Sequence, residues 1–165
     1  KFLGTIMLKS KTKNNSKNLQ IKDILAKTNT LILQNINHKK QLFSSLSNFI
    51  SKQSDITITE SSKLLYNKEL IEISGIGNGI AIPNIQSSYI TKTIGIFVKL
   101  LKPIKYNSFD KEPVDLIFLL SSPNTIKSDH LKTLALISRK LSNTKIQKNI
   151  RGTSDIESIY SILTM

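Results

Sequence analysis

The amino-acid sequence predicts an α/β protein, a three-layer α/β/α sandwich with a mixed central sheet, and three observations support this fold class. Segments with the apolar spacing of helices alternate along the chain with segments that have the pattern of strands. The stretch Val114–Leu120 is apolar at almost every position, which is typical of a central strand covered on both faces. A chain of 165 residues, 39% apolar and 21% charged, is long enough for one domain with a full core. Helices are therefore expected on both faces of one sheet.

The first half of the chain is expected to contribute an early strand and two helices. After a short helical turn near Ile21, the run Leu31–Leu33 predicts the first strand. Residues 38–52 place apolar side chains three and four residues apart, as in an amphipathic helix, and His38 is interpreted as a surface residue at its start. A second helix is expected to begin near Thr59, whose hydroxyl can cap it. Three leucines of that helix are expected to face inward: Leu64, Leu65 and Leu70.

The second half is expected to contribute the remaining strands and three helices. In chain order, strands are predicted at residues 80–82, 93–101 and 114–120, and helices at residues 128–141 and 145–150, followed by a last helix near the end of the chain. Ser128 is interpreted as the cap of the first of these helices. Ser154 with Glu157 three residues later is interpreted as the capping box of the last one.

Composition limits the classes of protein that the chain can belong to. Cysteine is absent, which excludes disulfides and thiolate metal sites, and no apolar run reaches the length of about 18 residues that a membrane span needs. Residues 1–18 contain several lysines and too little apolar content to fold alone. We therefore expect a flexible basic arm over residues 1–18, one folded domain over residues 19–165, and no membrane insertion.

The net charge of +13 raises nucleic acid as a partner. The lysines are scattered, however, and lack the interleaved aromatic residues of single-strand binders. Their abundance alongside isoleucine and asparagine is also what an AT-rich coding sequence favours. Nucleic-acid binding through the arm is therefore kept only as an alternative function.

The most informative stretch is Ser74–Asn84, which begins with three glycines at every second position: Gly75, Gly77 and Gly79. Glycine permits positive φ and close approach, so the spacing predicts a tight turn whose amides can face an anion; a purely structural turn is the alternative. Pro83 fixes φ and removes a donor, which ends the preceding strand and presents Asn84 at its tip. The common nucleotide motifs are excluded, because a dinucleotide fingerprint opens a helix and a P-loop needs Gly-Lys-Ser/Thr.

The string Gly-Ile-Gly-Asn-Gly-Ile-Ala-Ile-Pro, followed by one polar residue, resembles the active-site segment of IIA domains of the bacterial phosphotransferase system, in the fructose/mannitol class. It is most similar to the nitrogen-regulatory branch, where the string reads Ser-Thr-Gly-Ile-Gly-Asn-Gly-Ile-Ala-Ile-Pro-His. The resemblance extends over roughly residues 19–164 and implies the fold of that IIA class. In the family the final histidine accepts the phosphoryl group, and the matching position here is Asn84.

The same resemblance implies roles for further residues. His130, in the first turn of its predicted helix, matches the second active-site histidine of the family. Lys68 and Glu69 match an Arg-Glu pair, and the planar fork of arginine holds an anion more selectively than the point charge of lysine. Ser74 retains one of the two hydroxyls that precede the glycines in the family. The implied phosphate-binding residues are accordingly Lys68, Ser74, Gly75, Gly77 and Gly79.

The expected function depends on the chemistry of the side chain at position 84, which here is the amide of Asn84. Phosphoryl transfer to this site needs an imidazole nitrogen with a free lone pair, whereas an amide nitrogen is no nucleophile. We therefore expect a cytoplasmic, nitrogen-regulatory IIA-like protein that binds partners in an unphosphorylated-like state, without cofactor or metal. The resemblance implies docking of the histidine phosphocarrier protein and a regulatory target such as a potassium transporter or a sensor kinase. The alternative is an active phosphocarrier that accepts phosphate on His130.

Overall fold

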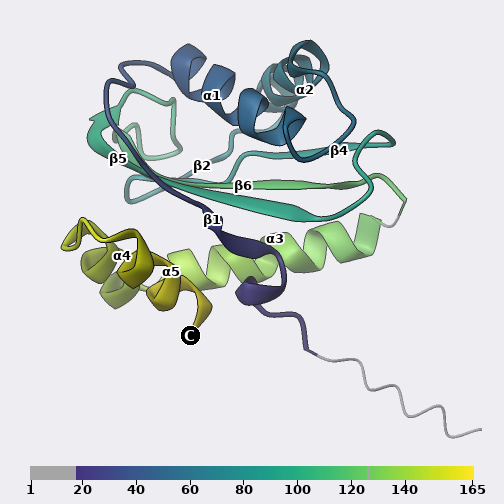
Figure 1. Ribbon diagram of the computed structural model, residues 1–165. Coiled ribbons are helices and arrows are strands. Elements are labelled where there is room, and N and C mark those ends of the chain that lie inside the picture. Colours follow the sequence, from purple (N-terminus) through teal and green to yellow (C-terminus); the bar gives the residue numbers. More distant parts are fainter. Residues whose placement is uncertain (1–17, 126) are drawn as a thin grey trace, which may run out of the picture.

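The computed structural model describes residues 18–125 and 127–165, which form three layers (Figure 1). Helices α1 (Lys39–Ser51) and α2 (Ile58–Ile71) cover one face of a six-stranded sheet. Helices α3 (Lys127–Leu141), α4 (Thr144–Arg151) and α5 (Ile156–Thr164) cover the other face. The predicted α/β/α sandwich is confirmed. The predicted arm, residues 1–18, lies outside the described residues except for its last one.

The six strands of the sheet are β1 (Leu25–Leu33), β2 (Gly75–Gly77), β3 (Ile80–Ala81), β4 (Asn84–Ser87), β5 (Ile94–Ile104) and β6 (Val114–Pro123). The sheet is mixed, as predicted, and its strand order is β1-β5-β6-β3-β2, with β4 also beside β6. β1 is parallel to β5, β5 is antiparallel to β6, β3 and β4 are both parallel to β6, and β2 is antiparallel to β3. β3 and β4 thus follow one another along the same edge of β6, with Ile82 and Pro83 between them.

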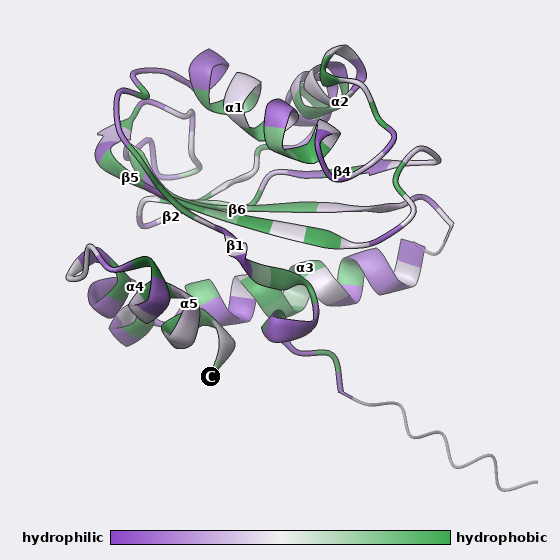
Figure 2. Ribbon diagram, viewed as in Figure 1, coloured by the Kyte–Doolittle hydropathy of each residue, from purple (hydrophilic) through white to green (hydrophobic). Residues whose placement is uncertain are grey.

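Strand β6 lies at the centre of the core, as its apolar sequence predicts. Ile117 and Leu119 belong to the buried cluster beneath α1 and α2, whereas Phe118 and Leu120 belong to the cluster that includes residues of α3, α4 and α5. The side chains of all four are fully buried. In Figure 2 the apolar stripes of α1 and α3 face the sheet, so burial of these stripes holds the layers together.

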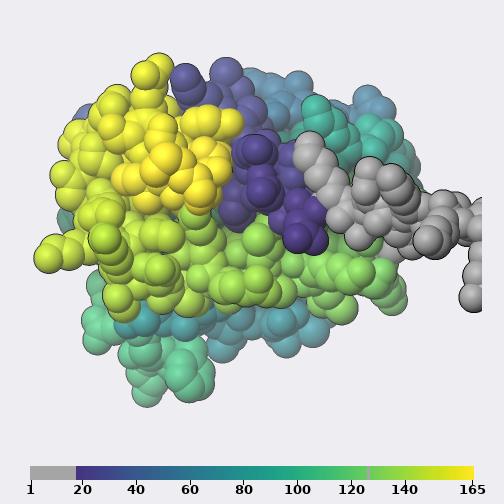
Figure 3. Space-filling model, turned by 90° about the horizontal axis from the view of Figure 1, so that it is seen from below, coloured from purple at the N-terminus to yellow at the C-terminus, as the bar shows by residue number. Residues whose placement is uncertain are grey.

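The two ends of the described chain meet on the lower face of the molecule. The short 3₁₀ turn η1 (Ile21–Asp23) and the start of β1 lie against α5, and Figure 3 shows these segments side by side. Lys27 forms an exposed ion pair with Glu157, 3.3 Å between Nζ and Oε1. Glu157 therefore bonds to β1 and does not complete the predicted capping box. Within the described residues, no helix has the length and hydropathy to cross a membrane.

Two helices begin with a different cap from the predicted one. Helix α2 is capped by Thr57, whose hydroxyl accepts from the Glu60 amide, so Thr59 lies inside the helix. Helix α5 is capped by Asp155, whose carboxylate accepts from the Ser158 amide, and not by Ser154. In each case several neighbouring side chains can act as caps, and spacing alone does not choose among them.

Helices α2 and α3 also differ from prediction in detail. Helix α3 begins at Lys127, so Ser128 lies within its first turn and not before it. Leu65 is buried as predicted, but Leu70 is 85% exposed. Five residues along a helix turn by about 140°, which carries Leu70 away from the face that Leu65 buries. Leu70 was therefore wrongly assigned to the core.

Candidate functional site

Asn84 lies at the start of β4, where pairing with β6 resumes after Pro83. Its side chain is only 9% exposed, so it is more enclosed than a residue presented at a strand tip. The amide nitrogen Nδ2 donates to the Ile82 carbonyl oxygen at 3.3 Å, and Oδ1 lies 3.0 Å from Nε2 of His130. Because a carbonyl oxygen can only accept, the Ile82 contact fixes which end of the amide faces the histidine.

His130 stands in the first turn of α3 and is buried between two hydrogen-bond partners. The amide oxygen of Asn84 only accepts, so the Nε2 atom of His130 carries the proton in this contact. The other nitrogen, Nδ1, lies 2.5 Å from the Ser122 hydroxyl, which donates to it in the neutral ring. Neither ring nitrogen has a lone pair free for another group.

The surroundings of His130 favour this neutral ring. Burial lowers the pKa of His130 from its ordinary value, and the positive charge of Lys68 lowers it further. The neutral form is the one that a Ser122 donor and an Asn84 acceptor both satisfy. The hydrogen bonds and the electrostatics therefore both favour the neutral form of His130.

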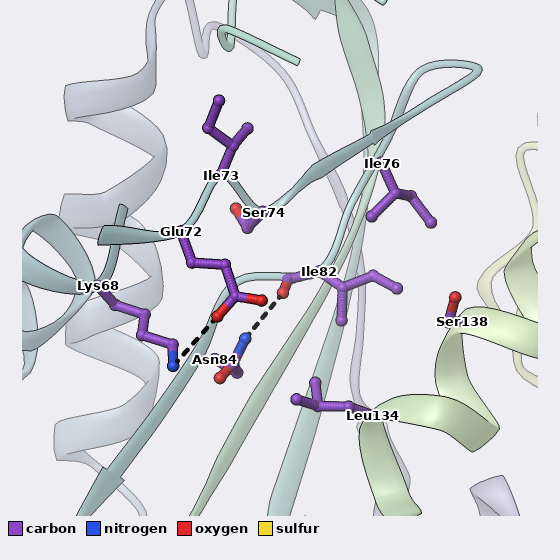
Figure 4. Close-up of a pocket in the computed structure, with 9 residues that line it drawn as sticks. All are labelled: Lys68, Glu72, Ile73, Ser74, Ile76, Ile82, Asn84, Leu134 and Ser138. Carbon is purple, nitrogen blue, oxygen red and sulfur yellow. Dashed lines mark hydrogen bonds and ion pairs between the residues drawn. The ribbon is translucent and has the colours of Figure 1, made fainter. Parts of the chain in front are cut away.

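Two cavities flank Asn84, and Lys68 of α2 lines both of them. The first cavity, of about 150 Å³, lies between the end of α2, the glycine segment and α3 (Figure 4). The second, of about 270 Å³, lies between α2 and β4. Lys68 is paired with Glu72, 3.4 Å between Nζ and Oε2. The first cavity is lined by Lys68, Glu72, Ile73, Ser74, Ile76, Ile82, Asn84, Leu134 and Ser138.

Ser74 lines the first cavity, but its hydroxyl is committed to a network behind it. The hydroxyl donates to the Glu69 carboxylate and lies 2.7 Å from the Tyr106 hydroxyl. Lys39 completes the network with an ion pair to Glu69, 3.0 Å between Nζ and Oε2. Burial, and then the charge of Glu69, raises the pKa of Tyr106 well above its ordinary value. The network joins α1 and α2 to the start of the glycine segment.

The glycines form the predicted tight turn, with Gly77, Asn78 and Gly79 all at positive φ. The Asn78 amide donates to the Asp110 carboxylate at 2.9 Å, so the turn binds an anionic side chain of its own chain. On the other side, Arg151 of α4 donates to the Asn78 carbonyl oxygen at 2.6 Å and also pairs with Asp115. None of the three glycines of the segment lines either cavity beside Asn84.

The structure therefore brings together four of the residues singled out in the sequence, Asn84, His130, Lys68 and Ser74, whereas Gly75, Gly77 and Gly79 line neither cavity. It adds Ser122 and Glu72, which the sequence analysis missed. Ser122 could have been recognised only as a hydroxyl at the end of the buried strand that leads to His130. Glu72 follows Lys68 by four residues, a helical spacing that predicts contact.

Comparison with known proteins identifies similar chains. The family described as phosphoenolpyruvate-dependent sugar phosphotransferase system, EIIA 2, matches residues 23–165. A nitrogen regulatory protein of Bradyrhizobium diazoefficiens is 34% identical over 150 residues, which cover 89% of this chain and 96% of that protein.

Solved structures agree with these matches. The crystal structure of nitrogen regulatory protein IIA-Ntr from Neisseria meningitidis superposes with a TM-score of 0.80 at 27% identity, over 86% of this chain and 97% of that one. Enzyme IIAMTL of Escherichia coli, solved in complex with phosphorylated enzyme IIBMTL, superposes with a TM-score of 0.67 over 82% of this chain and 94% of that one. At 13% identity, that second likeness shows the fold alone.

Proposed function

Because the chain belongs to the EIIA 2 family of the phosphoenolpyruvate-dependent sugar phosphotransferase system, we propose that it is a nitrogen-regulatory IIA-type protein that acts by binding a partner and carries no phosphoryl group. One observation supports this most directly. At the position that matches the family's acceptor stands Asn84, whose amide is hydrogen-bonded to His130 and to Ile82. The Asn84 amide nitrogen is not nucleophilic, because its lone pair is delocalised into the carbonyl.

His130 is no substitute acceptor in this proposal. Its Nδ1 lone pair accepts from Ser122, and its Nε2 carries a proton that is donated to Asn84. In-line transfer needs a free nitrogen lone pair aimed at phosphorus, and misplacement by about 1 Å costs roughly a hundredfold in rate. Asn84 and His130 therefore keep the hydrogen bonds of a folded site, but neither of them provides a nucleophile.

The surface around the site is suited to docking. Ile71, Ile73 and Ile76 line the two cavities and are 84%, 57% and 40% exposed, and Leu131, next to His130, is 64% exposed. Exposed apolar side chains grouped beside a polar centre are typical of protein-binding surfaces. We expect the protein to be cytoplasmic and a partner to cover these side chains, either the histidine phosphocarrier protein or a regulatory target such as a potassium transporter or a sensor kinase.

The test is incubation with a phosphoenolpyruvate-driven phosphocarrier system, followed by intact-mass measurement at neutral pH. The unmodified chain should gain no phosphoryl group, whereas Asn84→His should gain one. Asn149→His, on the exposed side of α4, is the matched control and should gain none. A phosphoryl group on the unmodified chain would contradict the proposal and indicate His130 as acceptor.

A further inference from the structure

Glu72 places a carboxylate in the cavity beside Asn84. It is the residue at which α2 ends, since its amide donates to the Lys68 carbonyl oxygen at 2.8 Å and its own backbone is extended. From there the side chain points toward Lys68 and Asn84 (Figure 4). The Lys68 Nζ and Glu72 Oε2 atoms are 3.4 Å apart.

Helix stability does not account for a glutamate at this place. A carboxylate at the C-terminal end of a helix is repelled by the helix dipole. A lysine followed four residues later by a glutamate is also the less favourable order for an ion pair along a helix. The pair is exposed to 42% and 70% at its two side chains, where such contacts contribute little to stability.

Glu72 changes the charge of the cavity. Among the described residues that line the cavity, Lys68 has the one positive side chain and Glu72 the one negative side chain. The remaining lining is apolar or neutral, and His130, which is hydrogen-bonded to Asn84, favours its neutral form. Glu72 therefore cancels the only charge there that would attract an anion.

We infer that Glu72 is a specificity-determining residue that weakens the binding of phosphate and phosphorylated groups at the site beside Asn84. This inference rests on the proposed function, because that proposal identifies the site as the matching place for a phosphoryl group. It adds an effect independent of position 84: an acceptor placed there, as in Asn84→His, would still be phosphorylated, but from a site whose affinity for phosphate is lowered by the resident carboxylate.

Binding of inorganic phosphate tests the inference without any transfer chemistry. Phosphate is titrated while the ring signals of His130 and the side-chain amide signals of Asn84 are followed by NMR. The variants are Glu72→Gln and the double variant Lys68→Met with Glu72→Gln. The control is Glu157→Gln, which removes an equally exposed carboxylate, 74% against 70%, from a lysine pair on α5.

Glu72→Gln should bind phosphate about fivefold more tightly than the unmodified chain, the size expected for removing one charge a few ångströms from the anion in a solvated site. The double variant should lose that gain, and Glu157→Gln should show none. Equal phosphate affinity in Glu72→Gln and the unmodified chain would overturn the inference, as would an equal gain in Glu157→Gln. These measurements of phosphate affinity do not depend on whether position 84 accepts a phosphoryl group. Failure of this inference is therefore distinct from failure of the proposed function.

Discussion

Asparagine can occupy position 84 without loosening the site because its amide has one donor and one acceptor at opposite ends. The donor bonds to Ile82 and the acceptor to His130. An alanine there would leave the His130 N–H without a partner in a buried position, which costs about 1–3 kcal/mol. An asparagine at this position therefore keeps the local structure and offers no nucleophile.

For His130, we predict that the free energy of unfolding decreases as pH falls below about 6.5, the ordinary pKa of histidine. Burial and Lys68 hold the pKa of His130 below that value in the folded chain. Between the two pKa values the unfolded chain binds a proton that the folded chain resists, so stability is lost; above both, the contribution is fully present. Urea unfolding at a series of pH values between about 8 and 5 measures the loss.

Three variants isolate the source of that pH dependence. His130→Gln should remove this part of it, and Lys68→Met should reduce it, because the lysine charge is the second cause of the lowered pKa. His38→Asn is the control, since it keeps a capping side chain at the start of α1 and should leave the effect in place. An unchanged pH dependence in His130→Gln would show that another group titrates.

Much of the candidate site could be predicted because its specific residues lie within short motifs. The glycine string identifies Asn84, and the resemblance to the IIA family identifies His130. Ser122 and the cavity role of Glu72 could not be predicted, because each depends on which elements meet in space. The exposure of Asn84 was also misjudged, since His130 comes from 46 residues away in the sequence to cover it.

Among the secondary-structure elements, the C-terminal end of α4 is hydrogen-bonded to a buried lysine of strand β5. Lys99 of β5 is only 7% exposed, and its ammonium donates to the carbonyl oxygens of Ile150, Arg151 and Thr153 at 3.0, 2.9 and 2.6 Å. All three donors of the buried cation are thus satisfied by carbonyl oxygens at the negative end of α4 and just after it. The same helix end carries Arg151, which bonds to the glycine turn, so Lys99 supports that turn indirectly.

We predict that Lys99→Met lowers the free energy of unfolding by about 2–3 kcal/mol, because it leaves buried carbonyl oxygens at the end of α4 without a donor. Lys102→Met, a similar change at an exposed position of the same strand, should alter stability by less than about 0.5 kcal/mol. Urea unfolding at neutral pH measures both variants. A loss of equal size in the two would indicate a general effect of charge on the strand.

Lys99 also shows where prediction from sequence ends for whole elements. Alternation along 93–101 identifies a strand, and the structure confirms one at Ile94–Ile104. Alternation does not reveal that the face with Lys99 lies under a helix end, because that contact joins residues about 50 positions apart. Long periodic segments were predicted well. The caps predicted for α2 and α5 lie one or two residues from the observed caps, because neighbouring polar side chains can act as caps equally well.

For the whole molecule, the net charge of +13 raises the question of whether the chain binds nucleic acid. Residues 1–17 hold five of the lysines and no acidic residue, so a chain starting at residue 18 has a formal charge of +8, which is +13 less five. Several of the remaining basic residues serve the fold: Lys39, Lys99 and Arg151 each bond to another element. A high net charge alone is therefore weak evidence for nucleic-acid binding.

We predict that removal of residues 1–17 leaves the melting temperature unchanged, because a lysine-rich segment with too little apolar content to fold alone is expected to contribute little to the core. The salt dependence of affinity for double-stranded DNA should also be the same, within about one unit of slope on a log–log plot, for the full and shortened chains. If the five lysines instead neutralised five phosphates, the two slopes would differ by about 4.5. DNA titrations across a range of salt concentrations distinguish these outcomes. A difference near about 4.5 would favour nucleic-acid binding by the basic segment, whereas equal slopes would argue against it.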